Sequence, residues 1–268
     1  MKWLLVALTL APGCSRPPQP VVVLATTTSV ANSGLLDVLT AEYQQDRGVI
    51  VRAHLVGSGR ALAMLGDGTA DVVISHAPDA EASALTQHPG WSYSKLMFND
   101  FVIVGPNADP AHVRDAHAAE EAFSRIAKSG SRFISRGDSS GTHEREQLLW
   151  RLAGAAPPSG NLVIAGQGMG ATLRIADQTM AYTLTDRATL AQNASSVALR
   201  VVFEGGPRLL NTYAVIYESR AAEPRAFGEW LIAGRGRDVI ANYQVAGTAV
   251  FTPWPLGQPR TNPASLPR

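Results

Sequence analysis

Four short segments of the chain are rich in hydroxyl side chains or glycine, and each lies where a predicted strand gives way to a predicted helix. They are residues 26–29, 57–59, 135–143 and 166–172. The first N–H groups of a helix have no partner within it and carry the positive end of its dipole. Glycine lets a ligand approach the backbone closely, and hydroxyls add neutral donors. Several such segments meeting at one cleft would bind an oxyanion.

Each segment taken alone has a simpler explanation, because Ser and Thr are also preferred N-cap residues. Arg136 is the one Arg or Lys in the four segments, and its planar guanidinium matches two oxygens of a tetrahedral anion. The alternative is a surface arginine paired with Asp138, and both hold if Asp138 orients Arg136. His143 is expected in the first turn of its helix, and Met169 is expected to fill space.

Catalytic motifs receive little support from the sequence. Residues 137–141, Gly-Asp-Ser-Ser-Gly, superficially resemble the nucleophile segment of trypsin-like proteases, but that family is all-β and this chain alternates strands with helices. There is no H-E-x-x-H and no G-x-x-x-x-G-K-[ST], so a zincin and a nucleotide hydrolase are not indicated. Residues 166–171 match a dinucleotide fingerprint only loosely. We therefore expect no enzyme, no cofactor and no bound metal cation.

Composition and charge exclude several other classes of protein. The chain has 268 residues, of which 46% are hydrophobic and 17% charged, so it is not disordered. With 23 Lys+Arg against 22 Asp+Glu, the net charge of +1 gives no general attraction for nucleic acid. The single Cys excludes an internal disulfide and a Cys-rich metal site. A charged ligand must therefore be held by a local site.

Residues 1–20 are expected to be a signal segment and linker. Residues 3–10 form an apolar run with the length of a signal h-region, too short to cross a bilayer as a helix. A small residue precedes Cys14, as in a bacterial lipobox, although Leu10 lies four residues before it and Pro12 is unusual there. The two readings are a lipoprotein acylated at Cys14 and an ordinary export signal. Both place the mature protein outside the cytoplasm, in the periplasm, and only the first gives it a membrane anchor, the lipid on Cys14.

Hydrophobic patterning predicts two α/β units. Buried strands at 21–24, 49–55 and 71–75 alternate with helices, and a second α/β set follows between two extended segments at 101–104 and 213–217. The predicted division is a first lobe of residues 21–101 and 217–251, a second lobe of 102–216 and a proline-rich tail of 252–268. Such a layout is typical of a hinged protein with ligand in the cleft.

Several motifs, in order from about residue 21 to 245, resemble the extracytoplasmic tungstate-binding proteins of tungstate ABC importers. They are ATTTS, VGSGRALA, DVVISHAPDAE, FNDFVIVGP, SRGDSSGTHERE, GQGMGATL, AYTLTDRAT and NTYAVI. The R-x-D-x-S-G-T portion is also similar to phosphate-binding proteins. The resemblance implies a two-lobed type II periplasmic-binding fold of the α/β class, with mostly parallel sheets. It also implies a monomer that binds tungstate or molybdate between the lobes and delivers it to an ABC permease.

The resemblance also implies which residues touch the anion. The direct contacts are expected to be Thr27, Ser58, Arg136 and Thr142. A second set comprises Thr28, Ser29, Ser140, Gly141 and the backbone at Gly168 and Gly170. Ser58 stands where family members often have threonine, and the hydroxyl is retained.

The protonation state of the ion separates the candidate ligands. Tungstate and molybdate are fully deprotonated at neutral pH, so their site should present donors only. Hydrogen phosphate still carries a proton, so its site benefits from an acceptor. Sulfate, like tungstate, is bound by donors only, but it is a smaller ion than tungstate or molybdate. Asp138 facing the cleft would favour phosphate, and Asp138 behind Arg136 would favour tungstate. Binding of phosphate or sulfate, and a sensor or adaptor with a degenerate site, remain the alternatives.

Overall fold

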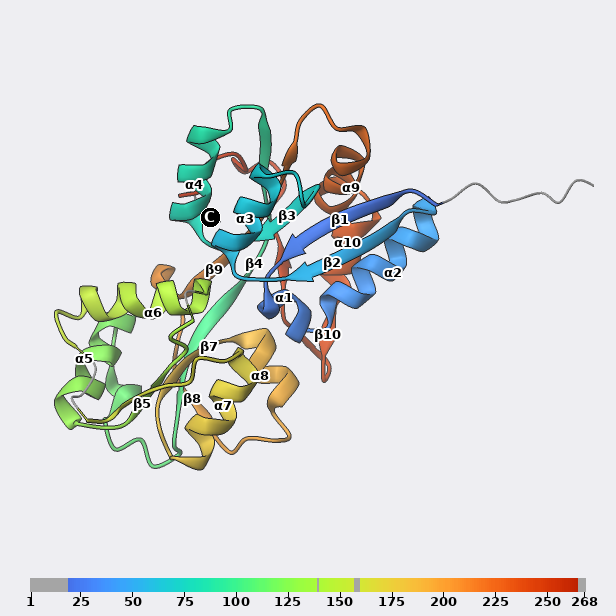
Figure 1. The fold of residues 1–268 in the computed structure, drawn as a ribbon. Helices are drawn as coiled ribbons and strands as arrows, with labels where there is room; N and C mark the ends of the chain where they lie inside the picture. The colour runs from blue at the N-terminus through green and yellow to red at the C-terminus, as the bar shows by residue number, and fades with distance from the viewer. Residues whose placement is uncertain (1–18, 139, 157–159, 265–268) are drawn as a thin grey trace, which may run out of the picture.

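The computed structural model describes residues 19–138, 140–156 and 160–264, which form two α/β lobes joined by two long strands (Figure 1). The predicted two-lobed α/β architecture is confirmed. The predicted signal segment and linker, residues 1–20, lie outside the described residues except for the last two, and the predicted lipidation site, Cys14, is among those outside. Among the residues that are described, no helix is long and apolar enough to cross a membrane.

The first lobe is built on three parallel strands. β1 (Val21–Thr26) lies between β2 (Ile50–Leu55) and β3 (Val72–Ser75), and pairs with both in parallel. The helices α2 (Leu35–Arg47) and α3 (Ser58–Gly66) make the connections between these strands, with the five-residue α1 ahead of α2. Because the three strands run the same way, their carboxyl ends meet at one edge of the sheet, and the segments that follow them lie together there.

Other elements complete both lobes. The first lobe also contains α1 (Thr28–Asn32), α4 (Pro78–Gln87), α9 (Ala222–Ala233), α10 (Arg235–Asn242), β10 (Gln244–Val245), β11 (Thr248–Ala249) and β12 (Thr252–Pro253). The second lobe contains η1 (Val113–Asp115), α5 (Ala119–Ser129), β5 (Phe133–Ser135), α6 (Gly141–Leu152), β6 (Leu162–Ile164), α7 (Met169–Gln178), β7 (Thr183–Asp186), α8 (Arg187–Asn193), β8 (Arg200–Glu204) and η2 (Pro207–Leu209).

Two strands run between the lobes and form the hinge (Figure 1). β4 (Trp91–Gly105) pairs with β9 (Leu210–Glu218) over residues 91–100, and then with β7 and β8 over residues 101–105. The change of partner falls between Asp100 and Phe101, one residue before the predicted lobe boundary at 101/102. The other predicted boundary, at 216/217, falls inside β9, whose pairing with the first sheet begins at Leu210. The two boundaries themselves stay predictions.

The expectation of mostly parallel sheets needs correction. β1 is parallel to β2 and β3, and β5 is parallel to β6, but β9 is antiparallel to both β3 and β4. β4 is likewise antiparallel to β7, β8 and β12. The reason is the topology of the hinge, since one strand must leave the first lobe and the other must return to it.

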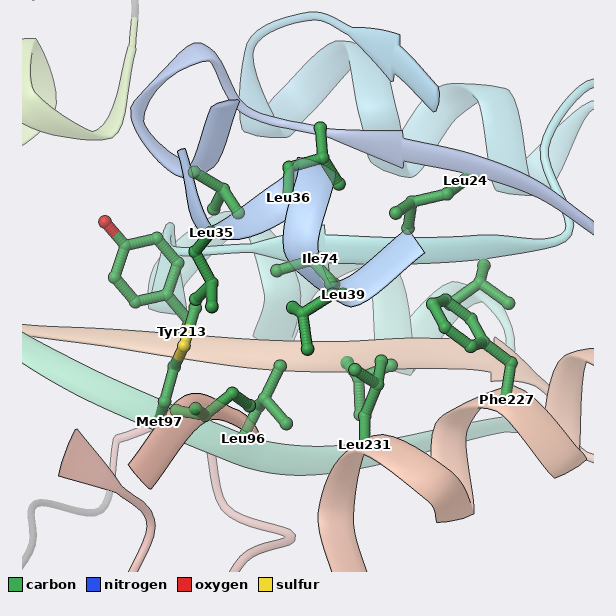
Figure 2. Close-up of a cluster of buried hydrophobic side chains, with 14 of the residues drawn as sticks. Leu24, Leu35, Leu36, Leu39, Ile74, Leu96, Met97, Tyr213, Phe227 and Leu231 are labelled. Atoms are coloured by element: carbon green, nitrogen blue, oxygen red, sulfur yellow. The ribbon is translucent and has the colours of Figure 1, made fainter. Parts of the chain in front are cut away.

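Helices cover both faces of each sheet, which explains the continuous apolar runs of the strands. In the first lobe α2, α9 and α10 pack on one face and α3 and α4 on the other. Figure 2 shows the first of these clusters, in which Leu39 of α2 lies above Leu231 of α9 and Leu35 lies beside Tyr213 and Met97. The second lobe repeats the arrangement, with α5 and α6 on one face and α7 on the other.

The first residues of the predicted tail pack on the first lobe. β12 pairs with β4 through Thr252 and Phe98, and Trp254 is fully buried. The backbone N–H of Trp254 donates to the carbonyl of Leu96 at 2.9 Å. A single large side chain provides this burial, so the segment shows none of the periodicity by which packed elements are recognised in a sequence.

Candidate functional site

Three polar residues follow the three parallel strands of the first lobe. Thr27 follows β1, Ser58 begins the helix after β2, and His76 follows β3 directly. All three are buried, with 4%, 1% and 4% of their surfaces exposed. The backbone N–H of His76 donates to the Ser58 hydroxyl at 3.4 Å. These residues therefore lie at one edge of the sheet, the edge that faces the second lobe (Figure 1).

The second lobe contributes Arg136 and Thr142 in the same way. Arg136 follows β5 and Thr142 lies in the first turn of α6, and both are buried, with exposures of 2% and 0%. An added Cβ at Gly141 would lie 2.5 Å from Cε1 of His76, so the start of α6 rests directly on the ring. A continuous chain of contacts therefore runs from Ser58 through His76 to the first turn of α6.

Four buried polar atoms at this junction have no hydrogen-bond partner among the described residues. They are Thr27 Oγ1, His76 Nε2, Arg136 Nη1 and Thr142 Oγ1. Buried polar groups in folded proteins are nearly always paired, and each one left unpaired costs about 1–3 kcal/mol. We call these four residues the junction cluster. Three of the four predicted direct contacts belong to it, and the fourth, Ser58, touches it through His76.

Helix capping does not explain the hydroxyl of Thr27. Thr27 stands at the N-cap position of α1 with an extended backbone, yet its side chain makes no capping hydrogen bond. Ser140 behaves differently, because its hydroxyl accepts the N–H of His143 at 3.4 Å and so caps α6. Helix capping therefore explains the hydroxyl of Ser140 but not that of Thr27.

Asp138 binds the guanidinium of Arg136. Its Oδ2 accepts hydrogen bonds from Arg136 Nη2 and, at 3.1 Å, from Nε. Its Oδ1 accepts the backbone N–H of Ser140 at 3.2 Å. These bonds lower the pKa of Asp138 against the raising effect of its burial, so the group is a carboxylate. Asp138 thus binds one edge of the guanidinium, formed by Nε and Nη2, and leaves Nη1 without a partner in the described structure.

Glu146 supports the same loop from α6. One of its carboxylate oxygens accepts the backbone N–H of Arg136 at 3.3 Å. Burial raises the pKa of Glu146 to about 7, although hydrogen bonds from Ser135 and from the backbone of Arg136 oppose the shift. The side chain is 3% exposed, so it positions the backbone of Arg136 from behind.

His76 and Glu146 were not among the predicted site residues. His76 directly follows a buried strand, just as Thr27 and Arg136 do, so its place in the chain was an available signal. Glu146 could not be found this way, because it lies in the second turn of a helix among other charged residues.

The structure places some residues of the second predicted set near the junction cluster and others away from it. Gly141 lies against His76, and Ser29 is buried inside α1 while Thr28 is half-buried. Gly168 and Gly170 instead line a pocket of about 290 Å³ between α1, α7 and α8, where Gly168 lies near Asn32 and Gly170 near Asn193. No hydrogen bond among the described residues connects these two glycines to the junction cluster. Their role as anion contacts stays a prediction.

A larger cavity of about 640 Å³ opens between α4, α6 and η2. Of the junction cluster only His76 lines it, beside Gly141, and its other walls carry Arg145, Arg151 and Arg208. The junction cluster itself is closed off from solvent, so the larger cavity is not the candidate site. No group of three or more His, Cys, Asp or Glu side chains able to hold a metal ion occurs in the described parts of the chain.

The chain is similar to known proteins over most of its length. Residues 15–235 match a family model described as a PBP superfamily domain. The tungstate-binding protein TupA of Peptoclostridium acidaminophilum is 37% identical over 243 residues, which cover 87% of this chain and 85% of that protein.

Two solved structures are similar in both sequence and fold. The tungstate ABC transporter structure from Geobacter sulfurreducens is 36% identical with a TM-score of 0.75, and the match covers 83% of this chain and 98% of that one. The tungstate-binding protein TupA from Desulfovibrio alaskensis G20 is 35% identical with a TM-score of 0.75, over 87% of this chain and 98% of that one.

Proposed function

The chain belongs to the PBP superfamily and has its two-lobed fold, and from that premise we propose that it captures tungstate or molybdate and delivers it to an ABC importer. The bound ion lies between the lobes, at the junction cluster. Its contacts are Thr27 and Ser58 from the first lobe and Arg136 and Thr142 from the second. The relatives named above that bind tungstate support the choice of ion.

The observation that carries the proposal is the set of unpartnered donors in the junction cluster. Thr27 Oγ1, Arg136 Nη1 and Thr142 Oγ1 are buried without partners among the described residues, and each can donate a hydrogen bond. The oxygens of a tetrahedral dianion would accept all three. The bond from Arg136 is charge-assisted and therefore stronger than the two from hydroxyls.

The orientation of Asp138 supports a fully deprotonated ion. Oδ2 of Asp138 accepts hydrogen bonds from Arg136 and Oδ1 accepts one from the backbone of Ser140, so both oxygens are already engaged. A hydrogen phosphate ion would need an acceptor for its proton, and this carboxylate is engaged elsewhere. The charge of the site therefore suits tungstate, molybdate or sulfate. The similarity to proteins named as tungstate-binding favours tungstate among them.

The proposal extends to the life of the protein in the cell. We infer export to the periplasm, anchoring by a lipid on Cys14, a monomeric state and an ABC permease as the partner. No covalent chemistry is assigned to the site, since a binding protein must release its ion unchanged.

Calorimetric titration with tungstate, molybdate, sulfate and phosphate tests the proposal. Tungstate or molybdate should bind with one site per chain and more tightly than the other two. Phosphate binding at least as tightly as tungstate would overturn the assignment of the ion. An absence of binding by all four ions would leave the sensor or adaptor reading instead.

A further inference from the structure

The ring of His76 makes an unusually close contact with the first residue of α6. A Cβ built on Gly141 would lie 2.5 Å from Cε1, 2.7 Å from Nδ1 and 2.9 Å from Nε2 of the imidazole. These three similar distances show that the ring lies flat against the glycine. Real Cβ atoms are not found this close to other heavy atoms, so only glycine allows the contact.

The contact joins the two lobes. His76 follows β3 in the first lobe, and Gly141 begins α6 in the second, immediately before Thr142. The closeness of α6 to the first sheet therefore depends on the size of residue 141. In a hinged protein, a contact between lobes exists only when the lobes are together.

The hinge strands hold the ring in place from the other side. Nδ1 of His76 bonds to Oδ1 of Asn211 at 2.9 Å, and Asn211 Nδ2 donates to Asn99 Oδ1 and to the Tyr213 hydroxyl. The His76 ring also stacks on Tyr213, with centroids 5.0 Å apart. Asn99 belongs to β4, and Asn211 and Tyr213 belong to β9, so both hinge strands orient this one ring.

The same hydrogen bonds define what His76 can offer an anion. Since the amide nitrogen of Asn211 donates elsewhere, its oxygen faces Nδ1, and Nδ1 carries the proton. Burial lowers the pKa of His76 to about 4, with Arg136 and Arg145 adding to the effect and the Asn211 bond opposing it. The ring is therefore neutral at pH 7, and Nε2 has a lone pair rather than a proton. A deprotonated oxyanion gains no hydrogen bond from it.

We propose that His76 is a positioning residue of the oxyanion site: its ring, fixed by both hinge strands, is the surface on which the first turn of α6 rests when the lobes close, and Gly141 permits that contact. The ring thereby sets how far Thr142 and the α6 N-terminus advance toward Thr27 and Ser58. This inference rests on the proposed function, because it concerns the closed state of that same site.

Calorimetry with sodium tungstate on the full chain and four variants tests this. Gly141→Ala keeps the backbone N–H, and alanine is favoured over glycine in a helix, so the variant should fold at least as well as the wild type. Its added methyl should keep the lobes apart and weaken tungstate binding about 10- to 100-fold, the range for an overpacked contact. Gly59→Ala is the matched control, because Gly59 also lies in the first turn of a helix and its added Cβ would meet nothing within 4 Å.

Replacing the His76 ring by a smaller side chain should restore part of the tungstate affinity that the methyl group of Gly141→Ala removes. His76→Ser/Gly141→Ala should bind tungstate more tightly than Gly141→Ala alone by about fivefold or more, because the clash is removed. His76→Ser alone, with thermal unfolding without tungstate, reports whether the core tolerates the shorter side chain. If it does not, His76→Asn in both backgrounds gives the same comparison.

The outcomes separate the inference from the proposed function. Failure of the wild type to bind tungstate would count against the function. Wild-type binding together with an unimpaired Gly141→Ala would overturn the role of the contact. The role of the contact would also be overturned if both double variants, Gly141→Ala with His76→Ser or with His76→Asn, bound tungstate as weakly as Gly141→Ala alone. Gly141 would then act independently of His76.

Discussion

Two groups of buried polar side chains in this protein differ in whether their atoms are paired. The first surrounds Glu81 and Lys95, both 0% exposed, in the first lobe. Glu81 accepts hydrogen bonds from Ser75, from Tyr93 and from a backbone N–H, and Lys95 donates to Thr212 and to the carbonyl of Pro263. The junction cluster is equally buried, but four of its side-chain atoms have no partner in the described structure.

The difference shows how burial of polar groups serves two purposes. A paired network fixes one arrangement of the chain, and here Lys95 fastens the C-terminal segment to β4. Unpaired donors make the folded state less stable and are retained where something else can pair with them. Stability should therefore depend on the Glu81–Lys95 group, and anion affinity on the junction cluster.

Removal of Glu81 should have the largest effect on stability. Glu81→Ala leaves three buried donors without their acceptor and removes the charge that favours protonated Lys95, and each unpaired buried donor costs about 1–3 kcal/mol. Denaturant unfolding should show this loss, while tungstate affinity measured at low temperature should stay near the wild-type value. Tyr93→Phe is the milder control, since it removes one donor to Glu81. A loss of affinity with full stability would contradict the comparison.

Lys95 should make stability depend on pH. Burial lowers the pKa of Lys95 to about 8 from 10.5, against the raising effect of Glu81. Between these two values the unfolded chain binds more protons than the folded one, so the free energy of unfolding should rise with pH by up to about 3 kcal/mol. Urea denaturation at several pH values, compared with Lys95→Met, checks the rise. An equal rise in the variant would mean that another group titrates.

Arg136→Ala should have the largest effect on affinity. The substitution removes the one cation expected to touch the ion, and a charge-assisted hydrogen bond is worth about 1.5–3 kcal/mol. Tungstate binding should weaken by that amount in calorimetry. Arg136→Lys keeps the charge but loses the fork held by Asp138, so it should recover only part of the loss. Unchanged affinity in Arg136→Ala would remove this residue from the site.

Thr142→Val should have the smallest effect on affinity, and it separates affinity from stability most clearly. The substitution removes an unpaired buried hydroxyl, so the protein without tungstate should be as stable as the wild type or more stable. Tungstate binding should weaken by about 0.5–1.5 kcal/mol, the value of a neutral hydrogen bond. Thr212→Val is the matched control, because its hydroxyl accepts from Lys95 and its loss should lower stability. Thermal unfolding with and without tungstate measures both effects.

Local sequence patterns predicted much of the fold. The apolar runs of β1, β2 and β3 and the helical spacing of α2 are visible because each buries a regular face. α1, α4 and α8 are less visible, since α1 and α8 are short and α4 buries little apolar surface. The antiparallel hinge strands and the packing of Trp254 depend on contacts between distant segments, which no local pattern reports.

The candidate site was accessible to sequence reasoning in part, for a physical reason. Thr27 and Ser58 follow strands of one parallel sheet, whose carboxyl ends gather at one edge, and Arg136 follows a strand of the parallel pair in the second lobe. The pairing of Asp138 with Arg136 was one of the readings that the sequence left open, and only the geometry shows that hydrogen bond. The contact of His76 with Gly141 was not foreseeable, because it joins residues 65 positions apart on different lobes.

A crystal structure with bound tungstate, located by the anomalous scattering of tungsten, tests the central claim most directly. The account predicts one tungsten peak between the lobes, with the oxygens of the ion accepting hydrogen bonds from Thr27 Oγ1, Arg136 Nη1 and Thr142 Oγ1. A peak in the cavity of about 640 Å³ between α4 and α6, with the junction cluster still unpaired, would contradict it.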